Sequence, residues 1–428
     1  MNISELYQLY LQHPVVTTDS RNCPAGSIFF ALQGESFDGN RFAEKALQSH
    51  CAYAVIDRPE AKTDERMILT DNVLKTLQQL ARHHRETLGV PIIGVTGTNG
   101  KTTTKELLAA TLSTTYKLLY TSGNLNNHIG VPLTLLRLTR EHEMAVVEMG
   151  ANHPGEIREL VEIVRPDYGI ITNVGQAHLE GFGSLEGVIR TKGELYDFLR
   201  QNGGKVFIHK ENTCLQAIAG GLDQITYGER EDAFISGCVT DCRPFLRFRW
   251  TQQGESHTVS TRLVGDYNLW NVLAAIAAGR YLGVPSEQIN RAIASYEPAN
   301  NRSQWKKTAG NELIIDAYNA NPSSMAAALT NFASLPVRPK AVILGDMREL
   351  GVNSPALHAE VVKQLQTSGF EQVLLCGEHF TSVGASIYPC FPDTEALNRY
   401  LSGNPLRGYH ILIKGSHGIH LEKTVDWL

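Results

Sequence analysis

The chain has 428 residues, and at about 150 residues per domain this length predicts about three domains and excludes a peptide or a disulfide-stabilised miniprotein. Hydrophobic residues make up 42%, charged residues 19% and aromatic residues 8%, which is typical of a chain that folds throughout. The 39 basic and 44 acidic residues give a net charge of −5 without a long Lys/Arg cluster, so nucleic acid is not an expected partner.

The N-terminal segment MNISELYQLYLQHP lacks the basic and apolar regions of a signal peptide. The longest apolar stretches, such as 272–278, are far shorter than the roughly 18 residues that span a bilayer. Seven scattered cysteines suit a reducing compartment, and Cys238 and Cys242 have no second Cys or His pair at zinc-site spacing. We therefore expect a cytoplasmic protein without membrane insertion or a cysteine metal site.

Residues 1–86 are predicted to form a small α/β domain. Apolar runs at 27–34 and 52–57 indicate strands, and FAEKALQSH and a polar stretch ending near Arg85 indicate helices.

Residues 87–298 are predicted to form a central nucleotide-binding domain. The apolar run VPIIGV, the turn GTNGK and the amphipathic run TTTKELLAATLS predict a strand, a loop and a helix. Strand-like runs at 145–148, 168–172 and 205–208 are separated by segments long enough for crossover helices, which predicts a mostly parallel sheet. The alternating runs FLRFRW and HTVSTRL then predict an antiparallel addition, and YNLWNVLAAIAAGRYLG predicts a helix.

Residues 299–428 are predicted to form a Rossmann-like domain. A linker is expected at 298–301, and the four apolar runs LIIDAY, KAVILGD, QVLLCG and HILIKG follow it. The predicted fold class is therefore α/β with three domains: a small N-terminal α/β domain, a central P-loop domain with a mostly parallel sheet, and a C-terminal Rossmann-like domain.

The turn after the first central strand carries the residues of a phosphate-binding loop. Backbone N–H groups and the helix dipole can surround phosphates there, Lys101 supplies a cation, and the Thr102 hydroxyl can hold Mg²⁺. Val95 stands where the common pattern has its first Gly, and a purely structural turn is the alternative. The predicted loop consists of Gly97, Thr98, Asn99, Gly100, Lys101, Thr102 and Thr103.

Three further residues become informative as a set. Glu148 follows a predicted parallel strand, where α/β sheets place ligands and where a carboxylate can reach magnesium. His178 follows the next strand, and Lys192 lies on the helix after it. The alternatives are a helix-capping Glu148, a structural His178 and a solvated Lys192.

Six segments together resemble a known family, and the resemblance runs from about Thr18 to Ser416. They are GVTGTNGKTTTKELL, GNLNNHIGVPLTLL, VVEMGANHPGEI, TNVGQAHLEGFGSLEGVIRTKGELY, DAYNANPSSM and VILGDMRELG. The family is that of the Mur ligases of peptidoglycan synthesis. GTNGKT alone also fits folylpolyglutamate synthetases, but YNANPSSM and EMGANHPGEI resemble the members that join D-alanyl-D-alanine to UDP-N-acetylmuramoyl-tripeptide.

The resemblance implies roles for individual residues. Residues 97–103 would bind ATP, with Asn271, Arg302 and Asp316 completing the nucleotide site. Thr102 and Glu148 would hold one Mg²⁺, and His178 and a carbamylated Lys192 a second. The implied catalytic residues are Lys101, His178, Lys192 and Arg302.

The resemblance also implies two substrate regions, and we expect a monomeric enzyme. The uridine end of the sugar nucleotide would meet Asp19, Ser20 and Arg21. The other implied substrate contacts are Asn126, Asn127, Tyr318, Asn319 and Asn321. Three positions depart from the family pattern, namely Asn301 for Gly, Tyr267 for His and His417 for Arg.

The implied activity is an ATP-dependent ligation through an acyl phosphate, in which Lys101, magnesium and Arg302 neutralise two approaching anions. Another Mur ligase and a folylpolyglutamate synthetase are the enzymatic alternatives. A P-loop switch protein is the alternative from another class, but the chain has no N-K-x-D guanine-reading motif.

Overall fold

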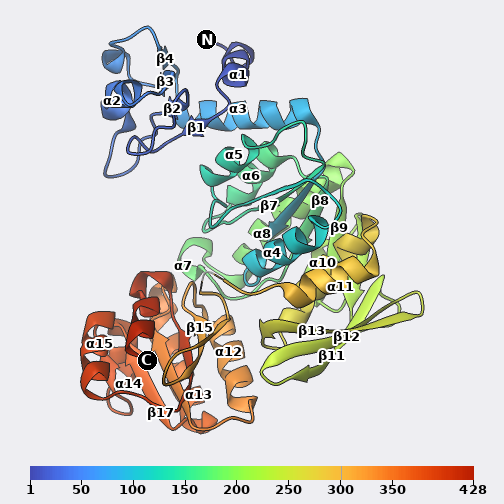
Figure 1. Ribbon diagram of the computed structural model, residues 1–428, viewed down its shortest axis with the longest axis vertical. Coiled ribbons are helices and arrows are strands. Elements are labelled where there is room, and N and C mark those ends of the chain that lie inside the picture. Colours follow the sequence, from blue (N-terminus) through green and yellow to red (C-terminus); the bar gives the residue numbers. More distant parts are fainter. Residues whose placement is uncertain (300) are drawn as a thin grey trace.

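Three sheets follow one another along the chain in a computed structural model that describes residues 1–299 and 301–428. The predicted linker at 298–301 contains Asn300, which lies outside the described residues. Figure 1 shows the N-terminal and C-terminal sheets at opposite ends of the molecule, with the nine-stranded central sheet between them. The mixed α/β architecture with mostly parallel sheets confirms the predicted fold class.

The first sheet has four parallel strands in sequence order. They are β1 (Val16–Thr17), β2 (Ile28–Phe30), β3 (Tyr53–Ile56) and β4 (Met67–Leu69). One face packs on α2 (Ala43–Gln48). The other packs on α1 (Ile3–Gln12) and α3 (Val73–Leu88), whose apolar core continues into the central domain. Helix α3 thus extends past the predicted domain boundary at residue 86 and belongs to both packing units.

The central sheet has the order β13-β12-β11-β10-β9-β8-β5-β7-β6. Strands β6 to β11 run parallel to β5, and the predicted antiparallel addition consists of β12 paired antiparallel with β11 and of β13 paired antiparallel with β12. The bounds are β5 (Ile92–Thr96), β6 (Leu118–Tyr120), β7 (Met144–Glu148), β8 (Tyr168–Ile171), β9 (Lys205–His209), β10 (Asp223–Gly228), β11 (Ile235–Cys242), β12 (Phe245–Gln252) and β13 (Glu255–Val264).

Helices cover both faces of the parallel strands, because successive strand residues point to opposite faces and both are apolar. Ile93 and Val95 of β5 face one layer, and Ile92 faces the other. The first layer contains α4 (Lys101–Leu112), α10 (Asn268–Tyr281) and α11 (Ser286–Ser295). The second contains α5 (Gly130–Leu135), α6 (Glu156–Val164), α7 (Leu179–Phe182), α8 (Leu185–Asn202) and α9 (Thr213–Ile218).

The third sheet has the order β14-β15-β19-β16-β17-β18. Its strands are β14 (Gln304–Lys307), β15 (Glu312–Asp316), β16 (Lys340–Gly345), β17 (Gln372–Cys376), β18 (Cys390–Phe391) and β19 (His410–Lys414). Helices α12 (Pro322–Ser334), α13 (Ser354–Ser368) and α14 (Glu378–Gly384) cover one face, and α15 (Thr394–Gly403) covers the other. The four predicted strands are present, whereas the edge strands β14 and β18 were not predicted.

Strand order determines where a ligand can bind. After β5 the chain forms β6 and β7 on one side of β5 and then crosses over to form β8 on the other side. Such a switch point opens a crevice at the carboxyl ends of parallel strands. In the third sheet, β15 and β19 end side by side, with Asp316 in register with Lys414.

Among the helices of the described ranges, none is both long and apolar enough to cross a bilayer.

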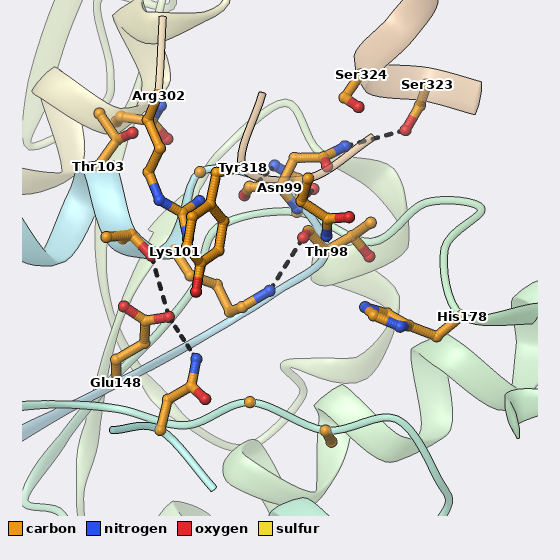
Figure 2. A pocket seen from close by; sticks show the side chains of 18 of the residues that line it. Thr98, Asn99, Lys101, Thr103, Glu148, His178, Arg302, Tyr318, Ser323 and Ser324 are labelled. Carbon is orange, nitrogen blue, oxygen red and sulfur yellow. Dashed lines mark hydrogen bonds between the residues drawn. The ribbon is translucent and has the colours of Figure 1, made fainter. Parts of the chain in front are cut away.

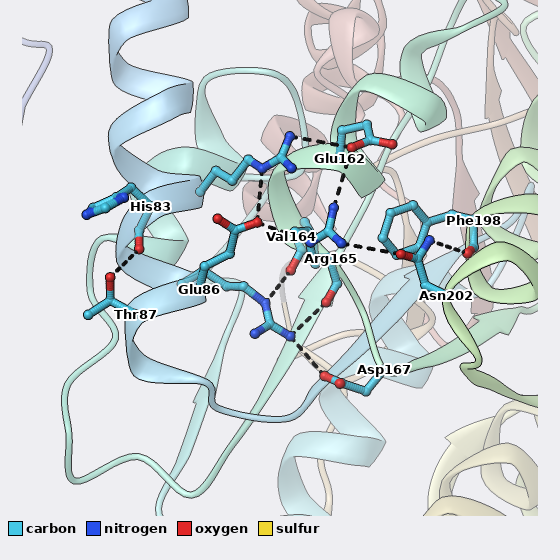
Figure 3. A network of polar contacts seen from close by, with 11 residues as sticks. His83, Glu86, Thr87, Glu162, Val164, Arg165, Asp167, Phe198 and Asn202 are labelled. Carbon is cyan, nitrogen blue, oxygen red and sulfur yellow. Dashed lines mark hydrogen bonds and ion pairs between the residues drawn. The ribbon is translucent and has the colours of Figure 1, made fainter. Parts of the chain in front are cut away.

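Helix α3 is fixed to the central domain by a buried guanidinium. Arg85 donates to the carbonyl oxygens of Val164 and Arg165 and to the Asp167 carboxylate, at 2.9, 2.7 and 2.9 Å. Asp167 also accepts from the backbone N–H of Ile92, where β5 begins. Figure 3 shows this cluster at the end of α6. The N-terminal domain is therefore joined to the central sheet by charge-assisted hydrogen bonds as well as by a shared core.

We expect Arg85→Met to destabilise the protein by about 2–4 kcal/mol, because it leaves two backbone carbonyls without their donor and Asp167 without its cation. Urea denaturation of the full chain measures this. Arg82→Met is the matched control, since Arg82 lies on the same helix and forms exposed ion pairs with Glu86 and Glu162. Loss of those pairs should cost no more than about 0.5 kcal/mol. Equal effects of the two variants would contradict the anchoring role.

Candidate active site

A cavity of about 550 Å³ lies where the carboxyl ends of the central and third sheets face each other. Most of the residues predicted for the site line it (Figure 2). These are Thr98, Asn99, Gly100, Lys101, Thr102, Thr103, Asn126, Asn127, Glu148, His178, Asn271, Arg302, Asp316, Tyr318 and Asn319. The predicted residues that do not line it are Gly97, Lys192, Asn321, Asp19, Ser20 and Arg21.

Two glycines allow the loop between β5 and α4 to turn tightly. Gly97 has φ +139°, and a Cβ there would lie 2.1 Å from the Thr172 hydroxyl oxygen. Gly100 has φ +79°, and a Cβ there would lie 2.5 Å from the Asn271 side-chain oxygen. Any larger residue at either position would clash as well as strain the backbone. The backbone N–H groups of Thr98 and Asn99 donate to Asn173, so the N–H groups left for phosphate are those at the N-terminus of α4.

Lys101 lies in this loop with its amine folded back. Its Nζ donates to the carbonyl oxygens of Gly97 and Thr98 at 2.8 and 3.1 Å. Burial lowers the pKa of Lys101 to about 8, with Glu148 opposing and Arg302 adding to the decrease. Because both partners are backbone carbonyls of the loop itself, the amine can exchange them for phosphate oxygens without leaving the site.

Glu148 and Thr102 fit one magnesium ion. Oε1 of Glu148 accepts from the Thr102 hydroxyl at 3.2 Å and from the Asn126 amide at 2.8 Å. Within residues 1–299 and 301–428 no group forms a hydrogen bond with its buried Oε2, and the residue is 1% exposed. A buried carboxylate oxygen without a donor is suited to a cation, and Mg²⁺ often combines one or two protein oxygens with phosphates and water. The side chain does not cap a helix, so that alternative for Glu148 is wrong.

His178 lies across the cavity from Glu148 and meets the third domain (Figure 2). Its Nδ1 lies against the carboxylate of Glu349. The backbone N–H of Glu180 also donates to the carbonyl oxygen of Glu349, at 3.3 Å. The pKa of Glu349 is lowered, mainly by its bond to His178. Sequence reasoning missed Glu349, because nothing in VILGDMRELG indicates which central-domain residue it approaches.

Lys192 lies behind the cavity wall. It is 2% exposed, and its Nζ donates to the carbonyl oxygen of Ala151 at 3.3 Å. The Phe182 ring lies 5.2 Å from the same nitrogen. Burial lowers the pKa of Lys192 well below its ordinary value, and the charge of Lys101 adds to the decrease. Because the side chain is buried, the alternative of a solvated helix lysine is wrong, and among the described residues Ala151 alone accepts a hydrogen bond from the amine.

The third domain contributes two side-chain pairs to the cavity wall, Arg302 stacked on Tyr318 and Lys414 paired with Asp316. The guanidinium of Arg302 lies 3.8 Å from the centre of the Tyr318 ring, which extends into the cavity (Figure 2). Lys414 is buried and donates to the Asp316 carboxylate at 2.5 Å and to the Asn319 carbonyl oxygen at 3.2 Å. Lys414 thereby fixes the end of β15. It was missed in the sequence because its partner is distant along the chain.

Two asparagines of the cavity wall are already engaged within the central domain. The Asn271 side chain accepts from the Thr104 hydroxyl at 3.1 Å and donates to Asn268 at 2.9 Å. Asn127 accepts from the backbone N–H groups of Ile129 and Gly130 at the start of α5. Their side chains are therefore held in fixed orientations.

The segment predicted to meet the uridine lies in the N-terminal domain, away from this cavity (Figure 1). Arg21 bonds to the Asp19 carboxylate through its side chain and backbone N–H, which lowers the pKa of Asp19 to about 2. Both side chains are largely exposed.

Three family models match consecutive parts of the chain. They are the Mur ligase family catalytic domain at residues 14–85, the Mur ligase middle domain at 95–279 and the Mur ligase glutamate ligase domain at 301–417. A relative from Bacillus subtilis named UDP-N-acetylmuramoyl-tripeptide–D-alanyl-D-alanine ligase is 34% identical, and the match covers 99% of this chain and 96% of the relative.

Two solved structures are similar over nearly the whole chain. MurF from Acinetobacter baumannii matches with a TM-score of 0.87 at 30% identity, covering 96% of this chain and 92% of that one. MurF ligase from Thermotoga maritima, solved in complex with ADP, has a TM-score of 0.87 at 25% identity and covers 97% of each chain.

We expect Glu148→Gln to weaken Mg²⁺ binding to the protein–ADP complex by at least about 10-fold, or about 1.4 kcal/mol. The amide keeps the size of the side chain but removes the charge that the cation needs. Calorimetric titration with MgCl₂ measures this. Glu159→Gln is the control, because Glu159 is an exposed carboxylate of the same cavity, and its change should stay below about 2-fold. Unchanged affinity in Glu148→Gln would contradict the assignment.

Proposed function

Because this chain belongs to the Mur ligase family, we propose that it joins D-alanyl-D-alanine to UDP-N-acetylmuramoyl-tripeptide with conversion of ATP to ADP and phosphate. This is a step of peptidoglycan precursor synthesis. The observation that carries the proposal is the cavity in which the phosphate loop and Glu148 meet Arg302 and Asp316 of the third domain. A P-loop switch has no need of that arrangement.

The reaction has two steps that place different demands on the protein. The terminal carboxylate of the tripeptide first attacks the γ-phosphorus of ATP, forming a carboxylate–phosphorus bond while the bond to the β-phosphate oxygen breaks and ADP leaves. The amine of the dipeptide then attacks the acyl carbon, phosphate leaves with the electron pair, and the amine loses a proton. The first step brings two anions together, and the second requires that water be kept from the acyl phosphate.

The phosphate loop is suited to the first demand. Residues 97–103 would bind the ATP phosphates, with Asn271 on the nucleotide side, and the T. maritima relative was solved with ADP. Lys101 would move its amine from the loop carbonyls to the phosphates. Arg302 and Asp316 would reach the nucleotide from the third domain, and Arg302 would place a second cation beside the transferred group.

Thr102 and Glu148 would hold one magnesium ion, and His178 with Lys192 would hold a second. Bound magnesium would neutralise phosphate charge and polarise the γ-phosphoryl group. Lys192 would take part as a carbamate: its neutral amine attacks the carbon of CO₂, a nitrogen–carbon bond forms, and one proton is released. This replaces an amine with an anionic oxygen donor of the kind that Mg²⁺ prefers.

The remaining roles concern the substrates. The N-terminal segment Asp19-Ser20-Arg21 would meet the uridine, and Asn126 and Asn127 would meet the substrate along the central domain. Tyr318 and Asn319 line the third-domain side of the cavity and would contact the peptides. Asn321 was predicted to do the same, but its side chain faces the phosphate loop. We place the reaction in the cytoplasm, where ATP and sugar nucleotides are available, and propose a monomeric enzyme.

We expect phosphate release from ATP only when UDP-N-acetylmuramoyl-tripeptide and D-alanyl-D-alanine are both present, because the acyl phosphate is turned over by the dipeptide amine. A phosphate-release assay with each substrate omitted in turn tests this. Turnover with UDP-N-acetylmuramoyl-dipeptide and a single amino acid would instead indicate another Mur ligase. Turnover with a folate and glutamate would indicate a folylpolyglutamate synthetase, and substrate-independent hydrolysis would contradict a ligase.

We expect Lys192→Met, which keeps the buried volume, to lower ligation at least about 100-fold, since a ligand of the reacting centre is lost. Arg190→Met, on an exposed part of the same helix, is the control and should stay within about 2-fold. Protein equilibrated with ¹³CO₂ should show one carbamate carbon signal by NMR that Lys192→Met lacks. Absence of that signal in the unaltered protein would contradict the carbamate.

A further inference from the structure

The third domain contacts the phosphate loop through a closed ring of three hydrogen bonds. The Asn99 amide donates to the Ser323 hydroxyl at 3.0 Å, which donates to Oδ1 of Asn321 at 2.9 Å. The Asn321 amide donates back to Oδ1 of Asn99 at 2.8 Å. Each side chain donates once and accepts once around the ring, so the bonds polarise one another in the same direction. Figure 2 shows Asn99 and Ser323 at this contact.

The orientation of the ring is set by helix α12. Asn321 is the N-cap of that helix, and its Oδ1 accepts from the backbone N–H of Ser324 at 2.9 Å. Its oxygen must therefore face the helix, which turns its NH₂ toward Asn99. With both lone pairs of Oδ1 used and one N–H given to Asn99, a single N–H remains for any other partner. The Asn321 side chain is thus committed to the helix and the phosphate loop.

On the other side of the ring, Asn99 has a firmly held backbone. Its N–H donates to the Asn173 side chain at 3.0 Å, and its carbonyl oxygen accepts from Thr172 and Asn173 at 2.6 and 3.0 Å. Asn99 directly precedes Gly100 and the first turn of α4. A side-chain bond at Asn99 therefore adds a third-domain contact immediately before Gly100 and the start of α4.

We propose that Asn321 and Ser323 are positioning residues, which hold Asn99 and thereby bring the phosphate loop to its reactive geometry only when the third domain is docked. The ring contains no charged group, so each bond can be replaced by water at little net cost when the domain moves away. The position of the third domain would then affect the conformation of the phosphate loop directly. Phosphoryl transfer from ATP would be favoured when the third domain contacts the loop. This inference rests on the proposed function for its kinetic readout alone.

Asn99→Ala and Asn321→Ser test the ring from its two sides. Serine is an equally good N-cap but too short to reach Asn99, so Asn321→Ser keeps helix α12 while removing the contact. Ser323→Ala, at an exposed position, is a third variant that should fold without difficulty. Ser324→Ala weakens the same helix start without touching Asn99, and it measures the effect of the helix alone.

Hydrogen–deuterium exchange of the full chain with ADP is the first readout. We expect faster exchange at residues 97–103 in Asn99→Ala, Asn321→Ser and Ser323→Ala, and less change in Ser324→Ala. The proposal would be overturned if residues 97–103 exchanged at the same rate in Asn99→Ala, Asn321→Ser and Ser323→Ala as in the unaltered protein. This readout remains valid if the proposed ligation is not observed, so the two failures are distinguishable.

The kinetic readout is a double-mutant cycle. We expect each of Asn99→Ala and Asn321→Ser to lower kcat by about 3- to 10-fold, corresponding to one or two lost hydrogen bonds, with the KM for D-alanyl-D-alanine changed less than about 2-fold. The double variant should be no slower than the worse single variant, because both remove the same ring. The proposal would be overturned if the double variant lowered kcat by the product of the two single effects. It would also be overturned if only the KM for the dipeptide changed, which would indicate a direct substrate contact.

Discussion

The close approach of the β5–α4 turn to its neighbours is the constraint on which the site depends. Gly97 passes under Thr172, and Gly100 passes against Asn271, at separations that leave no room for a Cβ. This allows α4 to begin directly beneath the cavity, with Lys101 and Thr102 in its first turn. The neighbouring strands β7 and β8 then determine which groups surround the turn, because their carboxyl ends lie beside it.

Neither domain contains a complete site. The central domain supplies the phosphate loop and the carboxylate of Glu148, whereas Arg302 and Asp316 come with the third domain. The buried Lys414–Asp316 pair and the Arg302–Tyr318 stack lie wholly within the third domain, so they orient its groups without contacts from the central domain. Such preorganisation matters for a reaction between two anions, since charge that is already oriented need not reorganise during the step.

Much of the fold could be predicted because the parallel strands are apolar on both faces. Runs such as those of β5, β7, β16 and β19 therefore stand out from polar helices and loops. Strand β14 has the sequence QWKK and lies at a sheet edge, and β1 and β18 have two residues each, so none carries that signal. The antiparallel strands were predicted from alternation, because one of their faces is more exposed.

Sequence motifs predicted those site residues that can be recognised within one continuous segment of the chain. Residues 98–103 of the predicted loop, Glu148 and Arg302 line the cavity, whereas Gly97 does not. Lys192 resembles a solvated helix lysine in sequence, and only the packing of α8 shows that its amine is buried. Glu349 and Lys414 were missed because their partners, His178 and Asp316, lie far along the chain and are brought near by domain docking and strand register.

The two interdomain junctions differ in chemistry, and this difference suits their tasks. Helix α3 shares an apolar core with the central domain and adds the buried Arg85, whose separation would expose a charge and several backbone carbonyls. The third domain has an apolar contact near the linker side, where Phe245 and Trp305 lie 5.6 Å apart, but at the cavity it relies on exchangeable polar contacts. A domain held by apolar packing on one side and by exchangeable hydrogen bonds on the other can rotate about the apolar side, since water replaces the polar contacts readily. The N-terminal junction also has exposed polar contacts, such as those of Arg82 with Glu162 and of Gln78 with the His128 carbonyl oxygen, but the shared apolar core and the buried Arg85 lie beside them. We therefore expect the first and central domains to move as one unit relative to the third.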